Sequence, residues 1–275
     1  MNPLVSIVTP SFNTGAFIEA SIQSVEQQDY PCIEHIVLDS GSTDGTLDVV
    51  ARHPAVLLVT PAPQSVSEKM NLGFSKARGE IVAWMNADDL YLPGAISKAV
   101  DALTRNPGVA VVYCNSLQVD ERGVEIGRER TKQASWQEML AHGYIPAGSA
   151  FVRREALERV GLVDTRYPLV QDWDLFLRIS KQFPTLYIDD WWSAFRIRQG
   201  QRSDLYTHDF WIQARKMTKE HGGGFFPLFQ DYWGTKLGRA GRMVRNGEFR
   251  RLRSKLSKYI LSVARHQVIR NKSDY

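Results

Sequence analysis

The stretch IVAWMNADD, residues 81–89, decides the fold of this chain. Its first five residues are apolar and predict a short buried strand, and Pro93 with Gly94 predicts a break before the next helix. Two adjacent carboxylates, Asp88 and Asp89, therefore follow a strand directly. In an open α/β sheet, ligands bind at this end of the strands. The pair fits a site for a divalent ion and a diphosphate, or a solvated turn that caps the next helix.

Strand and helix patterns alternate on both sides of this stretch. Strands are expected at 4–9, 33–38, 55–60, 81–85 and 109–114, with helices between them. The alternation predicts an α/β fold with a mostly parallel, doubly wound central sheet. Polar clusters follow three of the strands, at Thr9–Asn13, Asp39–Asp44 and Asn86–Asp89. Because the carboxyl ends of parallel strands meet at one edge of a sheet, we expect these clusters to line one mouth.

No glycine-rich dinucleotide fingerprint and no phosphate loop ending in Gly-Lys-Ser/Thr occurs in the sequence, so a diphosphate is expected to be held chiefly by a metal ion. Asp39 fits a fixed acceptor for a ligand donor, such as the imino N–H of a uracil-type base, or a helix cap. Arg196 and Arg198 are expected on one face of a late strand, where they either reach phosphate oxygens or form an ordinary surface pair.

Residues 171–179 (QDWDLFLRI) form the second informative stretch. Apolar residues recur at helical spacing from Trp173 onward, which places Asp172 at a helix N-terminus and Asp174 in its first turn. Acids there complement the backbone dipole. Alternatively, Asp172 serves as a general base at the rim of the mouth, since a carboxylate suits deprotonation of an attacking sugar hydroxyl.

Charge is distributed unevenly along the 275 residues. The net charge is +4, but from Lys236 onward twelve Lys or Arg residues stand against two acids. This basic segment, residues 236–275, fits a contact with an anionic membrane surface, a solvated helical pair or an oligomer contact. No nucleic acid partner is expected, because the segment carries no recognisable binding motif. Two distant cysteines, no signal peptide and no bilayer-spanning run predict a cytoplasmic protein, either free or peripheral at the inner face of the cell membrane.

Taken together, the motifs resemble the family 2 glycosyltransferases, a large inverting group with the nucleotide-sugar-binding GT-A fold, which is Rossmann-like. The matching stretches follow the family's order over about residues 4–200: Val5–Asn13, Asp39–Thr46, Met70–Gly73 with Gly79–Glu80, Asn86–Asp89, Phe151–Arg154 with Val160–Asp164, and Asp172–Arg178. Six such motifs in sequence are highly specific.

The resemblance implies a role for each matching position. Asp172 stands at the catalytic base position, and Asp89, assisted by Asp88, is the expected ligand of a divalent metal, Mn²⁺ or Mg²⁺. Arg198 stands where the family often has a His near the diphosphate, which leaves open whether the metal is strictly required. Gln171 stands where Glu is common. The implied nucleotide-binding residues are Thr9, Pro10, Ser11, Asn13, Asp39, Glu68 and Asp88, and the diphosphate-binding residues are Arg196 and Arg198.

The predicted organisation has three parts. Residues 1–115 form a nucleotide-sugar-binding half, residues 116–202 an acceptor-binding and catalytic half of the same GT-A domain, and residues 203–275 a basic helical C-terminal extension. The predicted function is inverting hexosyl transfer from a nucleoside-diphosphate sugar, UDP- or dTDP-type, to a hydroxyl of a saccharide or lipid-linked saccharide acceptor. The alternatives are a metal-dependent sugar nucleotidyltransferase, although the 10–15 loop lacks Lys and Arg, and a non-catalytic scaffold with a basic tail.

Overall fold

The computed structural model describes residues 2–198, 201 and 207–224. In these residues a nine-stranded sheet has the order β3-β2-β1-β4-β8-β6-β9-β5, and β7 pairs with β6. Strands β1 to β4, β6 and β9 run in one direction and β5, β7 and β8 run against them, so the expected mostly parallel α/β sheet is confirmed. The strands are β1 (Val5–Ser11), β2 (Ile33–Asp39), β3 (Val56–Val59), β4 (Ile81–Trp84), β5 (Leu90–Tyr91), β6 (Val111–Val119), β7 (Glu125–Glu129), β8 (Phe151–Arg153) and β9 (Thr185–Arg196).

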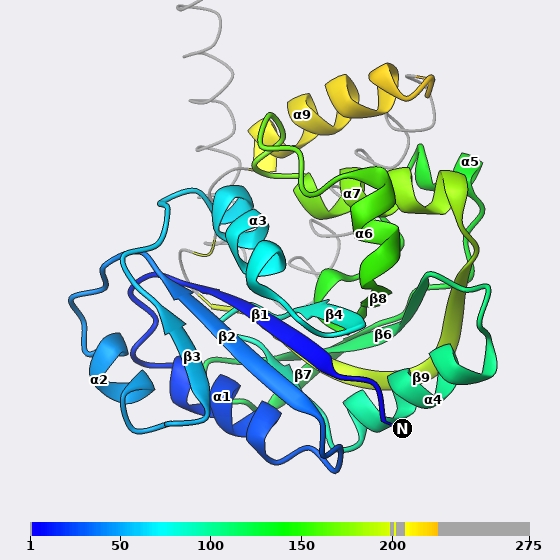
Figure 1. The fold of residues 1–275 in the computed structure, drawn as a ribbon. Coiled ribbons are helices and arrows are strands. Elements are labelled where there is room, and N and C mark those ends of the chain that lie inside the picture. The colour runs from blue at the N-terminus through cyan, green and yellow to red at the C-terminus, as the bar shows by residue number, and fades with distance from the viewer. Residues whose placement is uncertain (1, 199–200, 202–206, 225–275) are drawn as a thin grey trace, which may run out of the picture. The chain divides into compact units, whose positions relative to one another are not determined.

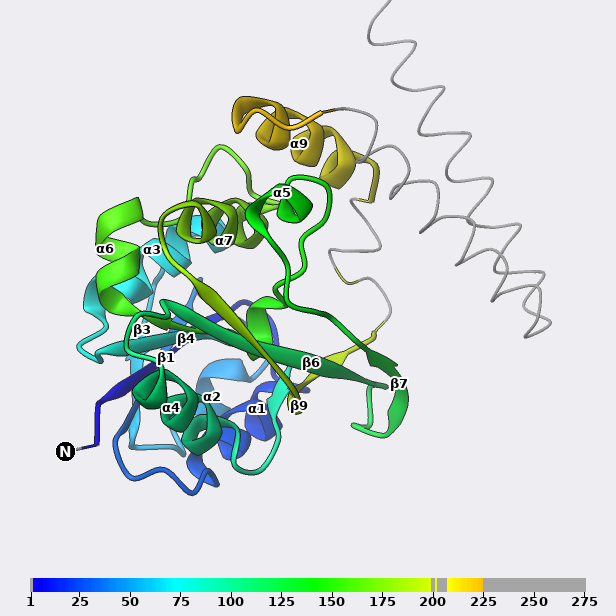
Figure 2. The same cartoon turned by 90° about the vertical axis from the view of Figure 1, so that its right-hand side faces the viewer.

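Helices cover both faces of the sheet (Figures 1 and 2). One face is packed by α1, α2 and α4, whose apolar residues join the core clusters of the strands. The opposite face is covered by α3, α6 and α7, and α3 lies so close to β1 that a Cβ on Gly73 would fall 2.3 Å from Val8. The helices are α1 (Ile18–Glu26), α2 (Thr46–Val50), α3 (Val66–Lys76), α4 (Ala95–Arg105), α5 (Trp136–Met139), the 3₁₀ turn η1 (Ala147–Ser149), α6 (Arg154–Val160), α7 (Gln171–Gln182) and α9 (Thr207–Glu220).

The direction of α7 decides where its first residues lie. The helix ends at Gln182, and β9 begins at Thr185 beside the first residue of β6, Val111. The C-terminus of α7 therefore sits at the edge where the parallel strands begin. A helix of this length spans roughly 18 Å, and its second turn, Leu175 and Phe176, lines a small internal cavity together with β4. The N-terminus of α7 consequently lies toward the carboxyl edge of the sheet.

Strand β1 is longer than the sequence predicts, and the late strand is shorter. Strand β1 continues through Pro10 and Ser11 because both residues pair with the end of β2, whereas a loop was expected from Pro10. Strand β9 continues to Arg196 because β6 runs beside it through two register shifts. Arg198 lies beyond the end of β9, so it does not share a strand face with Arg196.

The C-terminal part is described only up to residue 224. The first compact unit of the chain runs from residue 1 to residue 223 and includes α9. The basic segment 236–275, with its expected membrane contact, lies outside the described residues. Among the helices that the structure describes, none combines the length and the apolar composition needed to cross a bilayer.

Candidate active site

The loops after β1 and β2 are tied together by the side chains of Asn13 and Ser42. The backbone N–H of Asn13 donates to Ser42 Oγ at 2.7 Å, and the N–H of Thr43 donates to Asn13 Oδ1 at 3.0 Å. Asn13 has φ = 50°, a conformation that Asn tolerates better than most residues. With Ser11 and Asp39 paired in register, the first two polar clusters meet at one edge of the sheet, as expected.

Asp39 organises its own loop. Its carboxylate is fully buried, and Oδ1 accepts the N–H groups of Gly41 and Ser42 at 2.9 and 2.7 Å. Oδ2 accepts the hydroxyl of Ser42 at 2.6 Å. A carboxylate oxygen has two acceptor sites, so Oδ2 keeps one for a further donor. The loop contacts hold Asp39 in one orientation, which is what a fixed ligand acceptor requires.

The other residues expected at the nucleotide differ in their surroundings. The Thr9 hydroxyl is buried and forms a hydrogen bond with His35 Nε2 of β2 at 2.9 Å, so it points into the protein interior. Glu68 is exposed in the first turn of α3. Sequence reasoning missed Lys69, which is 2% exposed and donates to the carbonyl of Ser11 at 2.9 Å. No local pattern signals this burial, because adjacent positions of a helix face different directions.

The two adjacent acids after β4 have different environments. Asp89 is 3% exposed, its Oδ1 accepts the backbone N–H of Arg196 at 3.0 Å, and its Oδ2 accepts the Asn86 amide at 2.8 Å. Burial, and then the charge of Asp88, raise the pKa of Asp89 to about 7. The side chain of Asp88 is 18% exposed, and its Oδ2 accepts from Arg198 Nε at 2.7 Å. Asp89 thus faces inward, and Asp88 lies at the rim.

Arg196 and Arg198 differ in burial, as the two acids do. Arg196 is 4% exposed, and its guanidinium donates to the backbone carbonyls of Asp88 and of residues 120–121 in the β6–β7 turn. Its guanidinium therefore joins the end of β9 to the loop at Asp88 and to the β6–β7 turn. Arg198 keeps a 30% exposed side chain and an ion pair with Asp88. Both guanidinium carbons lie over the ring of Phe17, at 5.3 and 5.6 Å from its centre. No sequence pattern predicts this contact.

Asp172 is the second residue of α7, the helix whose N-terminus lies toward the same edge of the sheet. Its carboxylate is half-buried and accepts the backbone N–H of Trp173 at 2.9 Å. Burial raises the pKa of Asp172 above its ordinary value of 3.8, which strengthens it as a base. The Trp173 indole donates to the carbonyl of Met139 at 2.6 Å and so fixes the first turn of α7 against α5.

The donor set fits a divalent ion that shares its coordination with a ligand. In the described part of the chain, no group of three or more His, Cys, Asp or Glu side chains could hold a metal. Mg²⁺ and Mn²⁺ sites of nucleotide enzymes commonly use one or two carboxylates and fill the remaining positions with phosphate oxygens and water. Of the two acids expected to bind the metal, Asp88 lies at the rim and Asp89 faces inward.

Comparison with known proteins identifies related chains. The family described as glycosyl transferase family 2 matches residues 6–161. An uncharacterized glycosyltransferase of Rickettsia typhi is 27% identical over 195 residues, 66% of this chain and 61% of the relative, so the match spans less than two thirds of that protein. Chondroitin synthase of Escherichia coli is 24% identical over 191 residues, 68% of this chain and 28% of the synthase.

Solved structures share the fold. The mannosyltransferase PcManGT from Pyrobaculum calidifontis, solved with GDP-Man and Mn²⁺, aligns with a TM-score of 0.64 at 22% identity, over 83% of this chain and 67% of that one. Residues 1–349 of S. aureus TarS, solved with UDP-GlcNAc, align with a TM-score of 0.63 at 17% identity, over 78% of this chain and 65% of that one. The likeness confirms the GT-A type of fold.

Proposed function

We propose that this chain, which belongs to glycosyl transferase family 2, moves a hexosyl group from a nucleoside-diphosphate sugar to an acceptor hydroxyl with inversion at the anomeric carbon. The observation that carries the proposal is the edge of the sheet where β1, β2 and β4 end in polar loops and to which α7 directs Asp172. Family membership argues against both the nucleotidyltransferase and the non-catalytic scaffold.

The nucleoside half of the donor is assigned to the loops after β1 and β2. Asp39 keeps one acceptor site on a carboxylate that its own loop holds still. The imino N–H of a uracil or thymine base would donate to the second acceptor site of Asp39 Oδ2. This pairing favours a UDP- or dTDP-sugar as donor. Ser11 and Asn13 lie at the mouth beside Asp39. Lys69 of α3 holds the backbone of Ser11 by donating to its carbonyl.

The diphosphate is assigned to Asp88 and Arg198. Asp88 would hold a divalent ion, which would supply positive charge to the departing diphosphate. Arg198 stands next to Asp88 and offers a guanidinium that binds phosphate oxygens strongly. Arg196, with its guanidinium held by backbone carbonyls, keeps the β6–β7 turn and the Asp88 loop together. Leaving-group stabilisation is expected to be the largest contribution to the rate.

Asp172 is assigned as the general base. Its carboxylate takes the proton of the acceptor hydroxyl as that oxygen bonds the anomeric carbon, and the bond to the diphosphate breaks on the opposite face. Its raised pKa favours the transfer. A saccharide or a lipid-linked saccharide presents hydroxyls suited to this reaction.

The proposal predicts which compounds the protein consumes. Full-length protein should release nucleoside diphosphate from a UDP- or dTDP-hexose in the presence of Mn²⁺ or Mg²⁺, first seen as hydrolysis and then faster with an acceptor. A thermal-shift screen of UDP-, dTDP- and GDP-sugars, followed by chromatography of the released nucleotide, measures this. Release of sugar 1-phosphate and pyrophosphate instead would indicate nucleotidyl transfer and contradict the proposal.

The basic segment 236–275 is proposed to contact anionic lipid. Clusters of Lys and Arg near a membrane surface gain about 1 kcal/mol per residue from anionic headgroups, and twelve are present from residue 236 onward. The full chain should float with phosphatidylserine-containing vesicles, but not with neutral vesicles, and high salt should release it. Flotation that is equal in a chain ending at residue 235 would rule out this role.

A further inference from the structure

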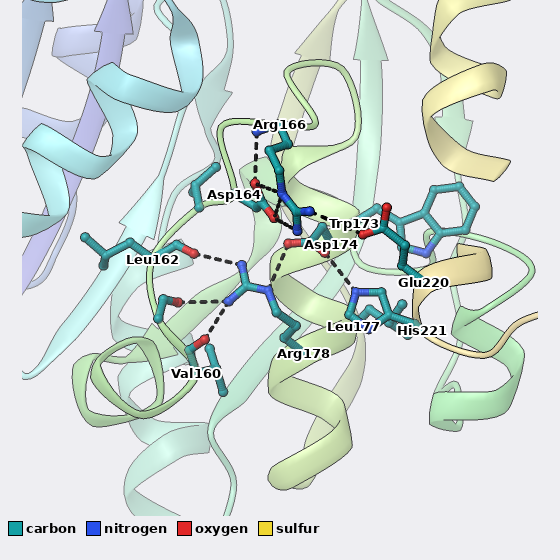
Figure 3. A network of polar contacts seen from close by, with 12 residues as sticks. Val160, Leu162, Asp164, Arg166, Trp173, Asp174, Leu177, Arg178, Glu220 and His221 are labelled. Atoms are coloured by element: carbon teal, nitrogen blue, oxygen red, sulfur yellow. Dashed lines mark hydrogen bonds and ion pairs between the residues drawn. The ribbon is translucent and has the colours of Figure 1, made fainter. Parts of the chain in front are cut away.

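A buried carboxylate two residues after the proposed base joins three parts of the chain. The side chain of Asp174, in the first turn of α7, is 2% exposed. Its Oδ2 accepts from Arg178 Nε at 2.8 Å, one turn further along the helix. Its Oδ1 accepts from His221 Nε2 at 3.0 Å, and His221 follows directly after α9 (Figure 3). Both oxygens of this buried carboxylate therefore accept hydrogen bonds, one from a residue of α7 and one from the residue that follows α9.

The Arg178 side of this network is anchored in the backbone. Its terminal nitrogens donate to the carbonyls of Val160, Gly161 and Leu162, at distances of 2.8 to 3.0 Å. These bonds tie the C-terminal end of α6 to the middle of α7. The first turn of α7, which carries Asp172, extends beyond this anchor toward the mouth. Arg178 reaches this turn at Asp174, and the Trp173 indole ties it to α5.

Helix α9 adds further contacts to this turn. The ring of Phe210 lies 6.4 Å from that of Trp173, the residue next to Asp172. Gln213 Oε1 accepts the backbone N–H of Leu169 at 3.0 Å, just before α7 begins. Ala214 and Met217 are fully buried. Helix α9 follows residue 161, where the family match ends, and it nevertheless packs on the turn that carries the proposed base.

We propose that His221 is a positioning residue: by bonding Asp174 it holds the first turn of α7, and with it Asp172, in register with the sugar's anomeric carbon. The inference rests on the function proposed above. Charged groups also meet near the end of α9, where Arg166 bonds Asp164 and lies 3.5 Å from Glu220. These groups keep the α9 end close to α7 but do not touch Asp174. Near the end of α9, the hydrogen bond to the side chain of Asp174 is that of His221.

The test compares His221→Leu with His221→Gln. Gln can place its amide N–H near the position of Nε2, whereas Leu leaves one oxygen of a buried carboxylate without its donor. A misplacement of about 1 Å at a reacting group costs on the order of 100-fold, so we expect His221→Leu to lose at least about 10-fold in kcat. His221→Gln should retain most of the rate. Binding of the donor nucleotide, which depends on the other loops, should change less than about 2-fold.

Amide hydrogen exchange provides a readout that does not need turnover. Peptides covering 171–176 should exchange faster in His221→Leu than in the wild type, while peptides of β1 and β2 should not. A matched control is His53→Leu, since His53 is also buried and bonded to carboxylates, those of Glu19 and Glu26. That variant should lose comparable stability and keep kcat within about 2-fold of the wild type.

The proposal would be overturned if His221→Leu had the same kcat and the same exchange at 171–176 as the wild type. It would also be overturned if His53→Leu lost as much kcat as His221→Leu. If His221→Leu does not fold, Phe210→Leu replaces it, since it keeps the His221 bond and an apolar side chain. Faster exchange at 171–176 in Phe210→Leu with lowered kcat supports the role of α9, and an unchanged rate and exchange overturn it. Absence of nucleotide-sugar turnover in the wild type would instead count against the proposed function.

Discussion

Replacing Asp172 with Asn should lower kcat by about 10²- to 10⁴-fold and leave the dissociation constant of the donor nucleotide nearly unchanged. The amide has the shape of the carboxylate, and its oxygen can still accept the backbone N–H of Trp173. It cannot accept a proton from an attacking hydroxyl. Steady-state transfer rates and titration of the nucleotide, measured on the same preparations, separate the two effects.

A matched control is Asp48→Asn, the same chemical change in the exposed first turn of α2, which should keep wild-type kcat. The pH profile gives an independent check. Because burial raises the pKa of Asp172, the wild-type rate should fall as pH is lowered through a value above the ordinary 3.8. Wild-type turnover in Asp172→Asn would remove this residue from the role of base.

Replacing Asp88 with Asn should lower kcat/KM by about 10²- to 10³-fold, the size expected when charge stabilisation of a leaving group is lost. The substitution removes a carboxylate from the rim and the partner of Arg198 in one step. Mn²⁺ binding, followed by electron paramagnetic resonance in the presence of nucleoside diphosphate, should weaken in parallel. The melting temperature should change little, because the side chain lies partly in solvent.

Asp89→Asn is the comparison that separates the two acids. Asp89 accepts from Arg196 and from Asn86 in a buried site, and an Asn side chain would set one amide against another there. We expect a loss of roughly 1 kcal/mol or more, equivalent to a fall of a few degrees in melting temperature, with smaller effects on Mn²⁺ affinity. The reverse pattern, with metal binding lost in Asp89→Asn and retained in Asp88→Asn, would support the metal ligand predicted from sequence.

Local patterns predicted most of what positions the site. The apolar run before Asn86, the helical spacing after Asp172 and the alternation of strands and helices are short-range signals, and each produced the expected element. The meeting of the loops after β1, β2 and β4 followed from the parallel sheet alone. These features are predictable because the spacing of apolar residues along the chain determines which side chains a helix or strand buries.

The division of work between neighbouring residues could not be predicted in the same way. Whether Asp88 or Asp89 faces the rim depends on Arg196, 107 residues away, whose backbone N–H occupies Asp89. The inward turn of the Arg196 side chain depends on carbonyls of the β6–β7 turn. The contact of α9 with α7 likewise joins His221 to Asp174 over 47 residues. Such pairings arise from tertiary packing, and no local pattern encodes them.

A crystal structure of the full chain with nucleoside diphosphate and Mn²⁺ would show the proposed arrangement of the site. We expect the metal and the β-phosphate to lie against Asp88 and Arg198 to contact phosphate oxygens. The Asp172 carboxylate should face the space where the sugar's anomeric carbon would sit. A diphosphate bound away from Asp88, or an Asp172 carboxylate separated from it by the body of the sheet, would contradict the account.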